Sequence, residues 1–152
     1  MWVILLLPLV LAVRLFAPLV TTAGKAIASG RMFGSTPSQA EPKYIGWGTS
    51  TTAESVSQTD LVAAAVEARV AGTASQVTTT TTNDTAQWVG TITASAAHGV
   101  GGGTAISEVA LFDAAGSGSP PTGGTMFLRA VHGAQNLGVG DGTQYTVGCQ
   151  FT

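Results

Sequence analysis

Hydrophobic and polar residues alternate with a period of two through most of the chain after residue 43. Such alternation is typical of strands that bury one face, and Gly, Pro, Asn and Asp separate the runs at intervals of about 8–12 residues. The pattern therefore predicts an all-β domain over residues 41–152, an antiparallel β-sandwich of jelly-roll-like form with six or seven strands. The runs are 44–47, 69–83, 85–94, 106–113, 125–131 and 144–151.

Asn83-Asp84 is expected to turn the chain between the second and third of these runs and so to form a hairpin. The second run is rich in Thr, a β-branched residue that favours strands. Five successive threonines, at 78–82, place hydroxyls on both faces, which predicts a half-buried or edge strand. Residues 60–66 fit either a capped helical turn or an extended connection. The side chains expected to share a face are Trp88, Gly90 and Ile92 in one strand and Met126, Leu128 and Ala130 in another.

The first twenty residues are apolar apart from Arg14, and they contain Pro8 and Pro18. Three interpretations stay open for this segment. A transmembrane helix needs about 20 apolar residues, but here it would include two prolines and an arginine that costs about 2.5–3.5 kcal/mol. A secretory signal peptide would lack a basic start, and small residues typical of a cleavage site occur only near 26–28. The third interpretation is an assembly arm that buries its apolar face against neighbouring subunits.

A short helix is expected from Leu19 to about Met32, because apolar residues recur there at helical spacing and Thr21 or Thr22 can cap its first turn. The breaker cluster at 34–38 then predicts a linker. The expected organisation is an apolar, partly helical N-terminal arm with its linker over residues 1–40, followed by the sandwich domain over residues 41–152. The residues expected to bind a partner are Leu15, Phe16, Leu19, Lys25, Ile27 and Arg31.

Charge is scarce in this chain. Only 9% of the 152 residues are charged, against about 25% in a typical soluble domain, and Thr, Gly, Ala and Ser take their place. A neutral, hydroxyl-rich surface suits a subunit that sits beside copies of itself. The net charge of −2 argues against nucleic-acid binding, which relies on clustered Lys and Arg. Most of the basic residues lie in the first third, so a basic arm precedes an acidic body.

The residues that could carry metal or catalytic chemistry are few. His98, His132 and Cys149 lack the spacing of zinc ligands, so isolated histidines and a small buried apolar cysteine are the preferred interpretation. No nucleophile or phosphate-loop motif is present in the sequence. We therefore expect no cofactor, no metal site and no enzymatic activity.

Structural roles are expected for the other polar and aromatic residues that stand out. Glu108 and Arg129 can pair across neighbouring strands, and such a pair contributes little if it is exposed. Trp47 and Trp88 are expected in the core rather than as sugar-binding platforms. Four aspartates are expected to cap backbone N–H groups at turns rather than to bind calcium. They are Asp60, Asp84, Asp113 and Asp141.

Four segments carry a resemblance to a known group of proteins. They are 41–49, 77–85, 108–113 (Glu-Val-Ala-Leu-Phe-Asp) and 145–152. In this order they resemble the β-sandwich module of tail-collar and tail-fibre proteins and of small head proteins in tailed phages. Ala110 stands where that group usually has Gly, and Leu19–Lys25 resembles the usual start of such chains. The resemblance covers about residues 19–152, leaves residues 1–18 outside, and implies a structural role in a virion.

The leading hypothesis is a capsid decoration or cement protein on the outer surface of a phage particle. Its N-terminal arm would be threaded among subunits of the major capsid protein, and its neutral faces would favour a homotrimer. A second hypothesis places the same fold in the tail, as a collar or fibre component that contacts tail proteins and the host surface. A third is a membrane-anchored or secreted binding domain, in which residues 1–20 provide the membrane contact.

Overall fold

The computed structural model describes residues 10–15, 18–32, 34, 39–101 and 103–151. Within these ranges the chain forms one helix and nine strands, which confirms the all-β class with more strands than the six or seven expected. In chain order the elements are β1 (Val10–Leu15), β2 (Leu19–Val20), α1 (Thr22–Met32), β3 (Tyr44–Gly48), β4 (Val70–Ala71), β5 (Thr73–Val77), β6 (Thr85–Thr93), β7 (Ile106–Phe112), β8 (Met126–Gln135) and β9 (Gly142–Gln150).

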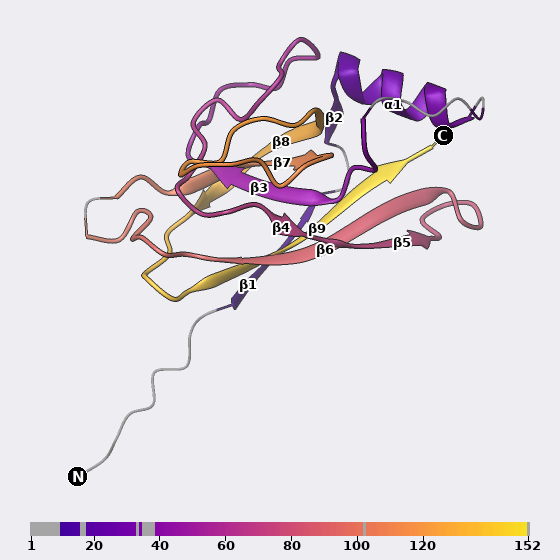
Figure 1. The fold of residues 1–152 in the computed structure, drawn as a ribbon. Helices are drawn as coiled ribbons and strands as arrows, with labels where there is room; N and C mark the ends of the chain where they lie inside the picture. The colour runs from indigo at the N-terminus through magenta and orange to yellow at the C-terminus, as the bar shows by residue number, and fades with distance from the viewer. Residues whose placement is uncertain (1–9, 16–17, 33, 35–38, 102, 152) are drawn as a thin grey trace.

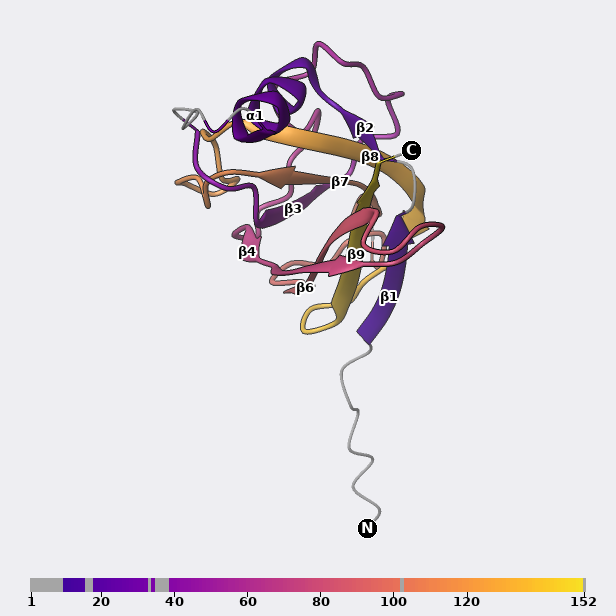
Figure 2. The ribbon, with the colours of Figure 1, turned by 90° about the vertical axis from the view of Figure 1, so that its right-hand side faces the viewer.

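The strands form two sheets that lie one above the other (Figures 1 and 2). Sheet A has the strand order β1-β9-β6-β5, and sheet B has the order β2-β8-β7-β3-β4. Neighbouring strands are antiparallel except for β1 and β9, which run parallel. The main core lies between the sheets, where apolar side chains from both meet. Its members include Ile45, Trp47, Trp88, Ile92, Leu111, Leu128, Tyr145 and Val147.

The predicted hairpin is present, but the threonine run does not belong to its strands. Strand β5 ends at Val77, and Thr78–Thr82 form the loop, in contrast to the strand expected over 69–83. The carboxylate of Asp84 accepts hydrogen bonds of 2.8–2.9 Å from the backbone N–H groups of three of these threonines. Local capping therefore replaces sheet pairing there. As expected, β5 lies at an edge and Asn83, with a φ of 60°, makes the turn.

All four aspartates accept hydrogen bonds from backbone N–H groups at turns, as predicted. Asp60 accepts from Leu61, Asp113 from Thr125 and Asp141 from Gly138, at 2.6–2.8 Å. Trp47 and Trp88 are buried in the main core, as expected from the sequence.

Strand β7 is buried along its whole length, on both of its faces. Its inner face meets the main core. Its outer face is covered by the connection between β3 and β4, where Leu61 packs with Ala110 and Phe112 in a second apolar cluster. The ambiguous stretch 60–66 is part of this connection and contains no helix.

A bulge changes the expected face of Met126. The pairing of β7 with β8 shifts between Leu111 and Phe112, so that Phe127 is an extra residue opposite them. Met126 then joins the outer cluster, while Leu128 and Ala130 point into the main core. The prediction that all three share one face is therefore wrong for Met126.

Within the predicted arm over residues 1–40, the described residues 10–15 and 18–32 contact both sheets of the sandwich. Strand β1 extends sheet A, strand β2 pairs with β8 in sheet B, and α1 packs on β8. Of the predicted linker at 34–38, residues 35–38 lie outside the described residues, as do residues 1–9. No helix among the described residues is long and apolar enough to cross a membrane.

Candidate partner-binding groove

An apolar groove lies between α1 and the sandwich, at the end where β9 finishes. Figure 1 shows α1 near this end of β9. It consists of two hollows of about 370 Å³ each, which share Ala28, Met32, Phe127 and Phe151. The first hollow also includes Ile27, Arg31, Glu41, Pro42 and Trp88, and the second also includes Val20, Lys25, Ser29, Cys149 and Gln150.

Two large apolar side chains in this groove face solvent. Met32, the last residue of α1, is 81% exposed, and Phe151, just after β9, is 60% exposed. The charged residues of the groove, Lys25, Arg31 and Glu41, are exposed at its border. An apolar floor with a charged border is typical of a surface that binds another protein.

Thr21 positions the helix that forms one wall. Its hydroxyl accepts a hydrogen bond from the backbone N–H of Gly24 at 3.0 Å, so Thr21 is the N-cap that the sequence predicted. The same hydroxyl donates to the carbonyl of Met126 at 2.6 Å, and the Thr21 N–H donates to the carbonyl of Phe127 at 3.0 Å. The start of α1 is therefore attached to β8 by its own capping residue.

Gly24 allows the helix to lie directly on the sheet. A Cβ atom at this position would collide with the carbonyl group of Phe127, which is backbone and cannot move aside alone. Close contact between α1 and β8 thus depends on a glycine at the first turn of the helix.

Replacing Gly24 by Ala is expected to destabilise the domain by about 1–3 kcal/mol, because the helix must shift away from β8 to accommodate the methyl group. Urea unfolding followed by tryptophan fluorescence measures this loss. The matched control is Ser29→Ala on the exposed side of the same helix, which should change stability by less than about 0.5 kcal/mol. Equal stability of the Gly24→Ala variant and the unmodified protein would contradict the close packing described here.

The residues predicted to bind a partner differ in their positions and in their exposure to solvent. Lys25 and Arg31 are exposed at the groove, and Ile27 is only 2% exposed because it packs in the domain's own core. Leu19 is half-buried in β2. Leu15 ends β1, and Phe16 lies outside the described residues. Ile27 nevertheless lines the first hollow of the groove.

Sequence reasoning missed three residues of the groove: Met32, Phe127 and Phe151. From the sequence, Met32 is predicted only to end the helix, and Phe151 only to end the last strand. No local pattern brings together residues as far apart in the chain as Met32 and the two phenylalanines. The one local signal in the sequence was Met32, an apolar residue at the predicted end of the helix.

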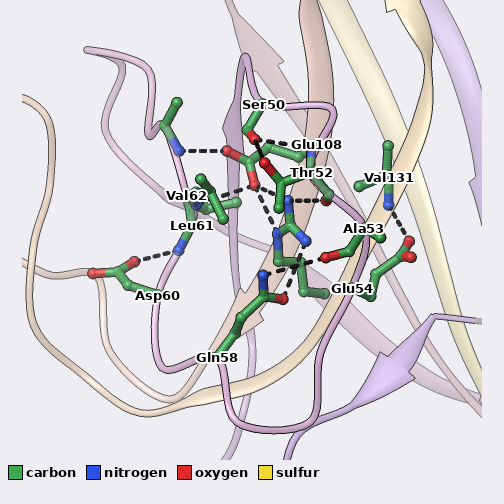
Figure 3. Close-up of polar contacts among 12 residues, drawn as sticks. Ser50, Thr52, Ala53, Glu54, Gln58, Asp60, Leu61, Val62, Glu108 and Val131 are labelled. Carbon is green, nitrogen blue, oxygen red and sulfur yellow. Dashed lines mark hydrogen bonds and ion pairs between the residues drawn. The ribbon is translucent and has the colours of Figure 1, made fainter.

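A buried ion pair holds the connection between β3 and β4 against the outer face of sheet B (Figure 3). The Arg129 guanidinium lies 2.7 Å from a carboxylate oxygen of Glu108, and both side chains are at most 1% exposed. Arg129 also donates to the side-chain carbonyl of Gln58 and to the backbone carbonyl of Thr52, at 3.1 and 3.0 Å. The predicted pair is confirmed, but it is buried rather than exposed.

The carboxylate of Glu108 also binds the backbone of the same connection. It accepts hydrogen bonds from the N–H groups of Val62 and Ala63 at 3.2 and 2.8 Å. Further along, Val56 accepts a hydrogen bond of 2.9 Å from the N–H of Thr22, the first residue of α1. One continuous set of contacts therefore links the buried pair to the helix that walls the groove.

A second buried carboxylate, Glu67, joins two other loops. It accepts hydrogen bonds from the Trp47 indole at 3.1 Å, from Ser95 and from the backbone of Ala96. The His98 imidazole lies 3.1 Å from both of its oxygens. Burial raises the pKa of Glu67, but the hydrogen bonds from His98, Ser95 and Trp47 together outweigh burial and lower the pKa to about 2.

The residues considered for zinc binding lie in separate environments. His98 contacts Glu67, whereas His132 lies 3.2 Å from the Tyr145 hydroxyl. Cys149 is half-buried beside the core and lines the groove, and its burial raises the pKa of the thiol. Among the residues that the structure describes, no three His, Cys, Asp or Glu side chains are grouped so that they could hold a metal ion.

Comparison with known proteins gives no further guide to the groove. The chain matches no protein-family model, and no curated protein or solved structure is significantly similar to it.

Proposed function

We propose that the chain is a structural, non-catalytic subunit of a tailed-phage particle, and specifically a decoration protein on the outer surface of the capsid. The observation that carries this proposal is the apolar groove beside α1, a surface suited to binding protein rather than a small polar substrate. The resemblance of residues 19–152 to small virion proteins supplies the phage setting. The jelly-roll-like form expected from the sequence stays a prediction.

The scarcity of charge supports a subunit with many close neighbours. With 9% charged residues and a net charge of −2, copies can pack without strong repulsion. Residues 1–9 (Met-Trp-Val-Ile-Leu-Leu-Leu-Pro-Leu) are wholly apolar. We take them alone as the proposed arm, because β1 and β2 pair with strands of the sandwich. Burial at about 25 cal/mol per Å² of apolar surface, repeated over many copies, would stabilise a shell.

Copy number distinguishes the head from the tail. Quantitative mass spectrometry of purified particles should find hundreds of copies of the chain per particle if it decorates the capsid. A dozen copies or fewer would support the alternative of a tail-collar or tail-fibre component that contacts tail proteins or the host. N-terminal sequencing of the mature chain tests the secreted alternative, and loss of residues 1–28 would support it.

Deleting residues 1–9 is expected to leave a folded domain and to reduce its occupancy on particles at least tenfold, because the arm is removed while both sheets stay complete. Occupancy is measured by mixing the purified variant with particles that lack the chain and sedimenting them. Circular dichroism and a thermal melt check the fold. Undiminished binding of the deletion variant would show that the arm does not provide the attachment.

A further inference from the structure

We propose that residues 1–9 of one copy bind in the groove beside α1 of a second copy, so that the chain assembles through exchanged N-terminal segments. The inference deepens the proposed function, on which its setting in a virion rests, by naming the partner of the groove. In this arrangement residues 1–9 join neighbouring decoration subunits on the shell, and their deletion lowers particle occupancy because the copies no longer bind as one multivalent assembly.

The position of β1 indicates a second copy rather than the same one. Val10 pairs with Gly142 at the start of β9, whereas the groove lies at Gln150 and Phe151, where β9 ends. Strand β9 separates these two ends by about 30 Å, at roughly 3.3 Å per residue. Nine residues span at most about 30 Å when fully extended. Reaching their own groove would therefore use their whole length and leave nothing to bind in it.

The chemistry of the segment matches that of the groove. Residues 1–9 contain no charged side chain and no hydroxyl, and they include Trp2 and five residues of Leu or Ile. The groove offers two hollows of about 370 Å³ each, a size that accepts large apolar side chains. It also leaves Met32 and Phe151 largely exposed, and a bound apolar segment would cover both.

The symmetry of the contact follows from its two different surfaces. A segment at one end of the sandwich binds a groove at the other end, so the contact closes either as a reciprocal exchange between two copies or as a ring of several copies. A ring of three copies agrees with the homotrimer expected from the neutral surface.

The first test measures the mass of the full-length chain in solution by light scattering after size exclusion. The unmodified chain is expected to have a multiple of its 15.2 kDa mass, and the variant that lacks residues 1–9 should be monomeric. Met32→Glu places a charge in the groove at an exposed position and should weaken assembly at least tenfold while the thermal melt is unchanged. The matched control Val100→Glu, at an exposed site outside the groove, should assemble normally.

The second test uses Cys149, which lines the groove. A chain carrying Leu5→Cys and Cys149→Ala is mixed with a chain of different length that retains only Cys149, and a mild oxidant is added. Exchange predicts a disulfide-linked dimer of the two lengths. Moving the acceptor thiol out of the groove, with Cys149→Ala and Val100→Cys, should reduce this product at least tenfold.

A monomeric unmodified chain, or assembly that persists after deletion of residues 1–9, would overturn the inference. So would equal cross-linking to Cys149 and to the thiol introduced at position 100. The outcomes that contradict exchange differ from those that contradict the decoration role. If the chain is monomeric in solution but binds particles only with residues 1–9 present, the segment contacts the capsid, and decoration stands without exchange.

Discussion

Replacing Arg129 by Met is expected to lower the free energy of unfolding by about 3–5 kcal/mol, because it leaves the buried carboxylate of Glu108 without its counter-charge. This is a large share of the roughly 5–15 kcal/mol that stabilises a typical domain. Met has a similar length, so the loss reports the charge rather than a cavity. Loss of the hydrogen bonds to Gln58 and Thr52 should also loosen the connection between β3 and β4. Urea unfolding measures the free energy.

A double variant distinguishes the cost of leaving one buried charge unpaired from the cost of removing the whole ion pair. Glu108→Gln together with Arg129→Met removes both charges and keeps one carbonyl oxygen. Val62 and Ala63 donate to different oxygens of Glu108, so this carbonyl can accept from the N–H of one of them. It should recover at least half of the loss caused by Arg129→Met alone. The control Lys43→Met removes an exposed cation and should cost less than about 1 kcal/mol. Equal costs for the two single replacements at 43 and 129 would contradict a buried ion pair.

Replacing Glu67 by Gln is expected to cost about 3 kcal/mol at neutral pH, because an amide N–H₂ would then face donors that now point to a carboxylate. The Trp47 indole donates to one oxygen of Glu67, and the N–H and hydroxyl of Ser95 donate to the other, so one of these two sets of donors loses its acceptor. Thermal or urea unfolding measures the difference between the variant and the unmodified protein. The exposed Glu41→Gln is the matched control and should change stability by less than about 0.5 kcal/mol.

The cost of Glu67→Gln should also depend on pH. The pKa of Glu67 is about 2 in the folded protein and 4.5 ordinarily, so the folded state favours the charged carboxylate. Its contribution is fully present above pH 4.5 and is lost as the pH falls toward 2. The stability difference between the unmodified protein and the variant should therefore narrow over this range. A difference that is constant from pH 7 to pH 3 would show that the charge of Glu67 contributes nothing.

Several features of the fold could be predicted because they depend on neighbouring residues. The turn at Asn83 and Asp84, the capping aspartates and the strands from β6 onward follow from local turn chemistry and two-residue alternation. The helix start at Thr21 follows from the capping preference of a hydroxyl. The threonine run was misplaced because its β-propensity was weighed without the carboxylate of Asp84, which provides the same N–H groups with another partner.

The sequence by itself determined the all-β class, the main strands and the two halves of the buried pair, since these are written in residue type and local spacing. Only the tertiary structure decided that Glu108 and Arg129 are buried, because the segment that covers them lies more than forty positions away in the chain. It likewise decided that β1 and β2 join the two sheets and that Met32 and Phe151 line one groove. Burial and long-range pairing depend on which distant segments cover a face, and no local pattern records that.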